Sequence, residues 1–197
     1  IADLSFSVIR KALIEARDWD PSLVISVNIS PTQLRDPWLA QKIVKLLVET
    51  SFPANRLEIE ITETSLFDNL SLAQSIVGSL KNQGIKLALD DFGTGYSSLA
   101  HLRALPFDRI KIDKSIISKV LSNPGELAIV QGTLLVARGL SAEVTAEGVE
   151  KQEEVAVLKL AGCTELQGHY FHQAMEASAF TKLLNTQRER EAERKLA

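Results

Sequence analysis

Apolar residues recur along this chain in two alternating patterns. In the longer segments they return every three or four positions, as on one face of an α-helix. Between these segments lie short runs rich in β-branched residues, such as LVISVNIS at 23–30 and LEIEIT at 57–62, which are typical of strands. The pattern predicts helices at about residues 4–18, 38–50, 71–83, 97–105, 126–139, 152–161 and from 177 onward, and strands at 23–30, 57–62, 85–91, 109–113, 143–149 and 165–171.

Strands that alternate with helices in this way are parallel, because each return to the sheet crosses over through a helix. Two α/β architectures fit, an open doubly wound sheet and a (β/α)8 barrel. The G-x-G-x-x-G fingerprint of dinucleotide-binding sheets is absent after the first strand. Polar residues inside or at the ends of most strands favour the barrel, whose strand ends converge on one active face. We expect a TIM-like (β/α)8 barrel with its first two strands missing from this chain and located upstream.

The composition is that of a soluble globular domain, or a large part of one. The chain has 197 residues, of which 45% are hydrophobic and 24% charged, and its net charge is −3. The negative balance argues against a polymeric nucleic acid as the main partner. A single cysteine, Cys163, excludes an internal disulfide and a cysteine-based metal site, which fits a reducing cytoplasm.

The two ends of the chain suggest a piece of a longer protein. The start has neither an initiator Met nor the basic region of a signal peptide, and no apolar run approaches the roughly 20 residues of a membrane span. We expect residues 1–197 to form one N-terminally incomplete barrel domain in the cytoplasm, although the parent protein can carry a membrane anchor. Residues 177–197, which end in the polar run QREREAERK, are expected to form a C-terminal helix and a possible linker.

Oxygen-bearing side chains lie on successive strands toward the same end. Asn28 lies on the first strand, Glu60 on the second, and Asp90 and Asp91 end the third. Buried charge is costly unless it is paired or bound to metal, and carboxylate and amide oxygens suit Mg²⁺ or Mn²⁺. Adjacent aspartates can bridge two ions about 3.5–4 Å apart, as in two-metal phosphoryl chemistry. Lys111, on the next strand, is placed to neutralise phosphate charge or to orient a water.

Each of these residues also has a structural explanation. Asn28 can be a strand hydrogen bonder, one of Glu58 and Glu60 can be solvated, and Lys111 can be a surface lysine. Asp90 and Asp91, two residues before Gly93, can form a turn or a helix cap. Their coincidence on successive strands favours a shared metal site.

Several segments resemble the EAL phosphodiesterase family, in order and spacing, from the start of the chain to residue 171. They are SVNIS at 26–30, EITET at 60–64, DDFGTGYSSL at 90–99, KID at 111–113, AEGVE at 146–150 and QG at 167–168.

The resemblance implies roles for particular residues. Asn28, Glu60 and Asp90 would bind one metal, and Asp90 would bridge to a second metal held with Asp91 and Glu147. Lys111 would contact the attacking water or the scissile phosphate, and Gln167 would hold a water or the phosphate region. Supporting residues would be Glu63, which steadies the loop 91–98 and its dimer contacts, the loop residues Gly93, Thr94 and Gly95, and Glu150 near Glu147.

The chain departs from the family pattern in two places. The Glu-Ala-Leu motif itself, with a metal-binding glutamate and a phosphate-binding arginine, is absent and is expected upstream of residue 1. After QG, the sequence HYFHQAMEA at 169–177 lacks the usual proline. His169 and His172 match ligand-pocket or rim positions, and Ile116 stands where a Phe is common and is expected in the core. Cys163 is expected to be buried.

The implied function is hydrolysis of cyclic di-GMP to linear pGpG with two Mg²⁺ or Mn²⁺ ions. The domain would be the output module of a bacterial signalling protein, as a homodimer and fused to diguanylate cyclase or sensor modules. The 197 residues alone are expected to be inactive, because one metal ligand and two strands are absent. The alternatives are a catalytically inactive receptor for cyclic di-GMP and, on fold analogy only, a metabolic barrel enzyme.

Overall fold

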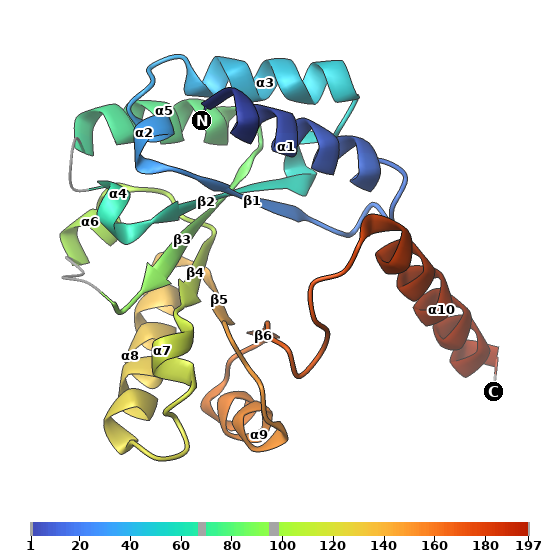
Figure 1. Ribbon diagram of the computed structural model, residues 1–197. Helices are drawn as coiled ribbons and strands as arrows, with labels where there is room; N and C mark the ends of the chain where they lie inside the picture. Colours follow the sequence, from blue (N-terminus) through green and yellow to red (C-terminus); the bar gives the residue numbers. More distant parts are fainter. Residues whose placement is uncertain (1, 67–69, 95–98, 197) are drawn as a thin grey trace.

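Six parallel strands form one sheet in chain order. The computed structural model describes residues 2–66, 70–94 and 99–196. Each strand pairs with the next in parallel, and within the described residues no hydrogen bonds join the first strand to the last. The predicted α/β architecture is therefore confirmed, as an open, curved sheet (Figure 1). The strands are β1 (Ile25–Ile29), β2 (Leu57–Thr62), β3 (Lys86–Phe92), β4 (Arg109–Ile112), β5 (Glu143–Ala146) and β6 (Glu165–Leu166).

Every helix predicted from the apolar periodicity is present. They are α1 (Ala2–Ala16), α3 (Leu39–Thr50), α5 (Leu70–Asn82), α6 (Leu99–Ala104), α8 (Pro124–Leu140), α9 (Gln152–Ala161) and α10 (Ala177–Leu196). Gly84 follows α5 with φ +82°, and this left-handed conformation, which glycine adopts readily, ends the helical segment. In Figure 1, α1, α3 and α5 cover one face of β1 to β3, and α8 and α9 lie beyond β4 and β5.

Four one-turn helices were not predicted. They are α2 (Pro31–Leu34), the 3-10 helix η1 (Ala54–Arg56), α4 (Glu63–Leu66) and α7 (Lys114–Ile117). A single turn is too short to show a 3.6-residue period, so apolar spacing does not reveal it. The caps did carry a signal, because Ser30 forms a capping box with Gln33 and Asp113 accepts a hydrogen bond from the backbone of Ser115.

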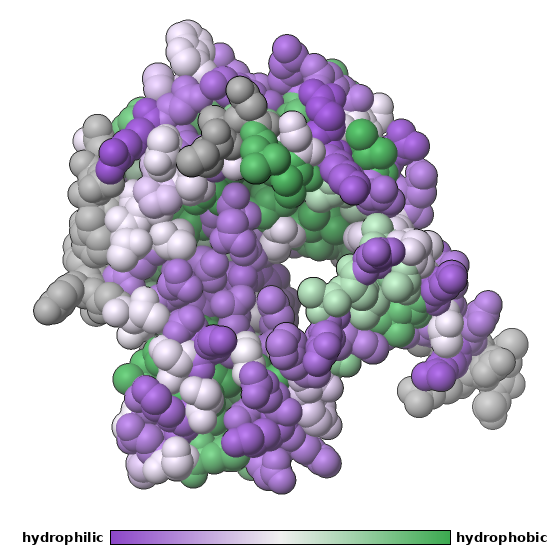
Figure 2. Space-filling model, in the orientation of Figure 1, coloured by the Kyte–Doolittle hydropathy of each residue, from purple (hydrophilic) through white to green (hydrophobic). Residues whose placement is uncertain are grey.

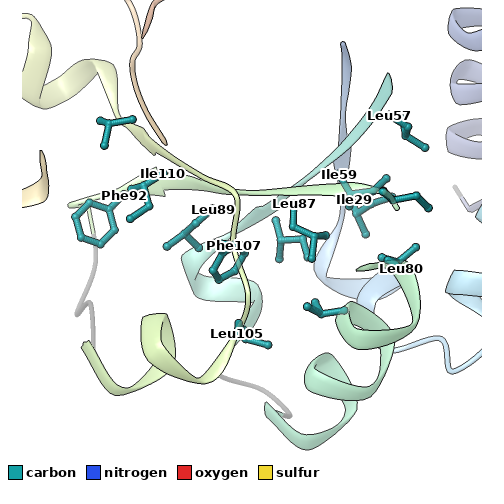
Figure 3. Close-up of a cluster of buried hydrophobic side chains, with 14 of the residues drawn as sticks. Ile29, Leu57, Ile59, Leu80, Leu87, Leu89, Phe92, Leu105, Phe107 and Ile110 are labelled. Atoms are coloured by element: carbon teal, nitrogen blue, oxygen red, sulfur yellow. The ribbon is translucent and has the colours of Figure 1, made fainter. Parts of the chain in front are cut away.

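The core lies between the convex face of the sheet and the helices. Strand residues at alternate positions, among them Leu57, Ile59 and Leu87, are fully buried against helix residues such as Leu80 (Figure 3). Each such side chain contributes roughly 1.5–3 kcal/mol on burial. Because side chains alternate along a strand, the intervening residues face the concave side, and this side carries the polar groups.

The last two strands are shorter than predicted. β5 ends at Ala146 because Gly148 turns the chain with φ +69°. β6 was predicted to reach residue 171 but ends at Leu166. Gly168 then packs directly on the backbone of Val149, so the chain turns away from the sheet.

The beginning of α10 packs on the turn that follows α1. The rings of Phe180 and Trp19 meet edge to face, 4.8 Å apart, and Trp19 Nε1 donates to Thr181 Oγ1 at 3.0 Å. Arg188 forms a 2.7 Å ion pair with Asp20. The remainder of α10 projects from the body (Figure 1). None of the helices described is long and apolar enough to cross a membrane.

Candidate metal and catalytic site

The concave side of the sheet holds a buried cluster of three carboxylates around one ammonium group. Lys111 Nζ, on β4, lies 2.6 Å from Glu60 Oε1 and 2.6 Å from Glu147 Oε1. The Oδ1 atom of Asp90 is 3.5 Å from the same nitrogen. Only 5% of Lys111 and 5% of Glu60 is exposed, so the group lies inside the fold. The structure thus brings together Glu60, Asp90, Lys111 and Glu147.

The strand register explains why these residues meet. Thr62 is the partner of Asp90 across β2 and β3, and Lys111 is the partner of Thr145 across β4 and β5. Glu147 follows β5 but extends the ladder, because its backbone N–H donates to the carbonyl oxygen of Ile112 at 3.1 Å. These side chains therefore lie at the carboxyl ends of neighbouring strands, where active sites of parallel barrels form.

Burial and ion pairing have opposite effects on the pKa values of Lys111 and Glu147. Burial alone would lower the pKa of Lys111, but hydrogen bonds and charge from Glu147 and Glu60 outweigh it and raise that pKa. Burial raises the pKa of Glu147, and Lys111 opposes this only in part. Lys111 is therefore a permanent cation near neutral pH.

The loop after β3 adopts a constrained conformation. Asp91 has φ +58°, and burial, followed by the charges of Asp90 and Asp113, raises its pKa. Gly93 has φ +97°, a backbone conformation that would strain any other residue, and a Cβ there would also push Ile116 Cδ1, 2.4 Å away, aside. Thr94 Oγ1 donates to the carbonyl oxygen of Asp91 at 2.9 Å. Gly95 lies outside the described residues. Ile116 is buried, as predicted.

Three predicted site residues surround the cluster. Asn28 is exposed on β1 and is the register partner of Glu60, so it lies beside the cluster at the sheet edge. Gln167 is exposed, and its backbone is held by hydrogen bonds to Ala146 O and from Val149 N. The side chain of Glu150 is also exposed.

Glu63 begins α4, directly after the strand that carries Glu60. Its side chain is 5% exposed, and neither carboxylate oxygen has a hydrogen-bond partner among the described residues. Buried acceptors in folded proteins nearly always have partners. The predicted supporting role of Glu63 therefore coincides with an unsatisfied buried charge.

A second polar layer, which the sequence analysis missed, lies below the first. Arg109 donates to Glu58 Oε2 at 3.0 Å, to Thr145 Oγ1 at 2.8 Å and to Glu143 Oε2 at 2.8 Å, and it also pairs with Glu165. The structural alternative in which one of Glu58 and Glu60 is solvated does not hold, since Glu58 is 3% and Glu60 5% exposed. The alternation of side chains along each strand contained this signal. Glu58 lies two positions before Glu60, and Arg109 two before Lys111. Glu143 lies four before Glu147 and Glu165 two before Gln167, so the members of each pair face the same side of the sheet.

Two cavities open on this polar side. One, of about 480 Å³, is lined by Glu147, Glu150, Gln167, His169 and His172. The other, of about 750 Å³, runs past Glu58, Arg109 and Lys111 to Phe180 of α10. Figure 2 shows the hydrophilic surface in this region and the hollow beside the C-terminal segment.

Cys163 is buried ahead of β6, as predicted, and burial raises the pKa of its thiol.

The donor chemistry of the upper cluster fits a hard divalent cation. Three carboxylates converge on a single positive centre, and Asp90 Oδ1 is buried without a hydrogen-bond partner among the described residues. The positive centre here is the ammonium of Lys111, and in the described part of the chain no three His, Cys, Asp or Glu side chains are already grouped as a metal site. Metal binding at this point would therefore replace Lys111 as the partner of the carboxylates.

The fold and the site define a parallel α/β domain of the barrel type, with an acidic, cation-centred cluster at the carboxyl ends of its strands. The chain belongs to the EAL domain family, whose model matches residues 1–174. The solved structures that it matches are EAL domains, which are TIM barrels, so the six strands are part of that fold.

Relatives with described activities share much of this chain. The cyclic di-GMP phosphodiesterase PdeR of Escherichia coli (strain K12) is 37% identical over 166 residues, which are 84% of this chain and 25% of PdeR. The PaMucR phosphodiesterase in complex with c-di-GMP has a TM-score of 0.87 and 30% identity, over 91% of this chain and 74% of that one.

A manganese and cyclic di-GMP complex of Klebsiella pneumoniae BlrP1 has a TM-score of 0.78 and 26% identity, over 85% of this chain and 43% of that one. The chain spans between 22% and 30% of the length of the curated relatives it matches.

Proposed function

We propose that this domain hydrolyses one phosphodiester of cyclic di-GMP to give linear pGpG, within a larger signalling protein. The observation that carries the proposal is the convergence of Glu60, Asp90 and Glu147 on one cation at the carboxyl ends of the strands. The activity described for PdeR and the ligands described for PaMucR and BlrP1 support the choice of substrate and of a divalent metal.

Each residue in the cluster would have a separate task. Glu60 and Asp90, with Asn28 at the sheet edge, would hold one Mg²⁺ or Mn²⁺ ion. Asp90 would bridge to a second ion, held also by Asp91 and Glu147. Two such ions, when bound, activate a water and neutralise the charge that develops on the phosphate.

The remaining groups would orient the substrate. Lys111 would place its ammonium on a phosphate oxygen or on the attacking water. Gln167, at the rim of both cavities, would hold a water or the phosphate region. Glu150 lines the same cavity as Glu147 and would support this side of the pocket.

Glu63 and the loop residues Gly93, Thr94 and Gly95 would fix the segment that carries Asp91 and connect it to a homodimer contact. The relatives are several times longer than this chain, and we propose that the parent protein also carries cyclase or sensor modules.

The test is hydrolysis of cyclic di-GMP by the full-length protein with Mn²⁺ or Mg²⁺, with pGpG measured by chromatography. We expect turnover that disappears with EDTA and falls by at least about 100-fold in Asp90→Asn. Full activity of Asp90→Asn would refute the bridging role. Tight binding of cyclic di-GMP without pGpG would instead identify a receptor.

A further inference from the structure

Two buried polar groups near the site lack hydrogen-bond partners among the described residues. They are the Nε2 atom of Gln33 on α2 and the carboxylate of Glu63 on α4. Each residue is 5% exposed. One group can only donate a hydrogen bond and the other, when ionised, can only accept one. Leaving both unpaired costs the fold the desolvation of an amide and of a charge.

The orientation of the Gln33 amide is fixed by its other end. Its Oε1 atom accepts hydrogen bonds from the backbone N–H of Ser30 at 3.1 Å and from Ser30 Oγ at 2.9 Å. A backbone N–H can only donate, so the atom facing Ser30 must be the carbonyl oxygen. The NH₂ end of Gln33 is therefore the end that points away from Ser30.

The two groups lie on elements that contact each other. α2 follows β1 and α4 follows β2, and Ile29 and Ile61 near the ends of these strands are register partners. Cα atoms of α2 and α4 approach within 8 Å (Figure 1). Both side chains are therefore buried on elements that adjoin each other.

We propose that Gln33 is a positioning residue, which donates a hydrogen bond from Nε2 to the carboxylate of Glu63. The bond would tie together the segments that follow Asn28 and Glu60, and so fix the distance between these two strand ends. Its consequence for metal binding rests on the proposed function, whereas its effect on folding does not.

The first experiment is a double-mutant cycle in the full-length protein, measured by urea unfolding of this domain without metal. Gln33→Glu places two carboxylates together, and Glu63→Gln leaves two amides. We expect the first change to destabilise the fold and to raise the unfolding equilibrium constant on the order of tenfold or more. The exchanged pair, Gln33→Glu with Glu63→Gln, restores donor and acceptor and should return to within about threefold of the unaltered chain.

A matched control exchanges the same residue types at exposed positions, Gln41→Glu with Glu153→Gln, and should show no coupling. Additive effects of the Gln33 and Glu63 changes would overturn the proposal. If a charged variant does not fold, the cycle is run with Gln33→Leu and Glu63→Leu. There the double change should be less harmful than the sum of the single changes, and additivity would again overturn the proposal.

The second experiment measures Mn²⁺ binding to the full-length protein by calorimetry. We expect Gln33→Leu to weaken Mn²⁺ binding about tenfold, Gln41→Leu to leave it unchanged, and the exchanged pair to restore it. A purely structural Gln33 would leave the affinity of the folded protein unchanged, which would overturn the positioning role. If the unaltered protein binds no Mn²⁺ while the unfolding cycle shows coupling, the proposed function fails and the Gln33–Glu63 bond stands.

Discussion

Lys111 Nζ donates a 2.6 Å hydrogen bond to Glu60 Oε1, from β4 to β2 across the intervening strand β3. The bond crosses the concave side of the sheet and is almost fully shielded from solvent. A buried charge of either sign is tolerated only with its partner. The same pair therefore stabilises the fold at the place where metals are proposed to bind.

Lys111→Met should destabilise the metal-free chain by about 3–5 kcal/mol, because Glu60 and Glu147 lose their shared cation. Urea unfolding in EDTA measures this loss, and added Mn²⁺ should recover part of it. The control is Lys45→Met, which removes an exposed helical pair with Glu49 and should cost less than about 1 kcal/mol. Equal losses in the two variants would show that the buried cluster is not specially dependent on Lys111.

Arg109→Met should also destabilise the chain by about 3–5 kcal/mol, since it leaves Glu58 buried without its ion pair. Glu58→Gln combined with Arg109→Met should be more stable than Arg109→Met alone, because the buried carboxylate is then neutral, while Glu143 and Glu165 are exposed to solvent. Chemical unfolding of the unaltered chain and of these two variants gives the comparison. A double variant less stable than Arg109→Met would contradict the ion-pair explanation.

Gly168→Ala should disrupt the turn after β6, because a Cβ there would lie 2.1 Å from the carbonyl oxygen of Val149. We expect a loss of about 3 kcal/mol or more, as for other severe steric changes in the interior. Gly78→Ala is the matched control, since its Cβ meets nothing within 4 Å in the middle of α5. That change should stabilise the chain by up to about 1 kcal/mol. Thermal unfolding distinguishes the two outcomes.

Asp20 should titrate with a pKa of about 2, below its ordinary value of 3.8. Hydrogen bonds from the side chain and backbone of Ser22 are the main causes, followed by Arg188. Because the folded pKa is the lower one, the stabilisation is complete above about pH 4 and is lost as the pH falls toward 2. NMR titration should show a larger upward shift in Ser22→Ala than in Arg188→Ala. The reverse order would show that Arg188 on α10, and not Ser22, is the main cause of the lowered pKa of Asp20.

Much of the site could be predicted because a parallel strand places its functional residues at one end. Glu60, Asp90, Lys111 and Glu147 were each found from their position at a strand end and from the family resemblance. Their direct contact could not be predicted, since it depends on the curvature of the sheet. The lower layer around Arg109 was not predicted, because its residues lie at the beginnings of the strands and not at their carboxyl ends. The alternation of side chains with a period of two continues along each strand and places both layers on the same side of the sheet.

The sequence by itself determined the order of helices and strands, the parallel sheet and the set of candidate ligands, because periodicity and local propensity act over a few residues. The tertiary structure alone decided that Glu58 is buried with Arg109 and that β6 stops at Leu166. It also decided that Lys111 holds the three carboxylates together and that Gln33 and Glu63 are buried on the adjoining helices α2 and α4. These outcomes depend on contacts between residues about 20 to 50 positions apart in the chain, whose desolvation and close packing no local pattern encodes.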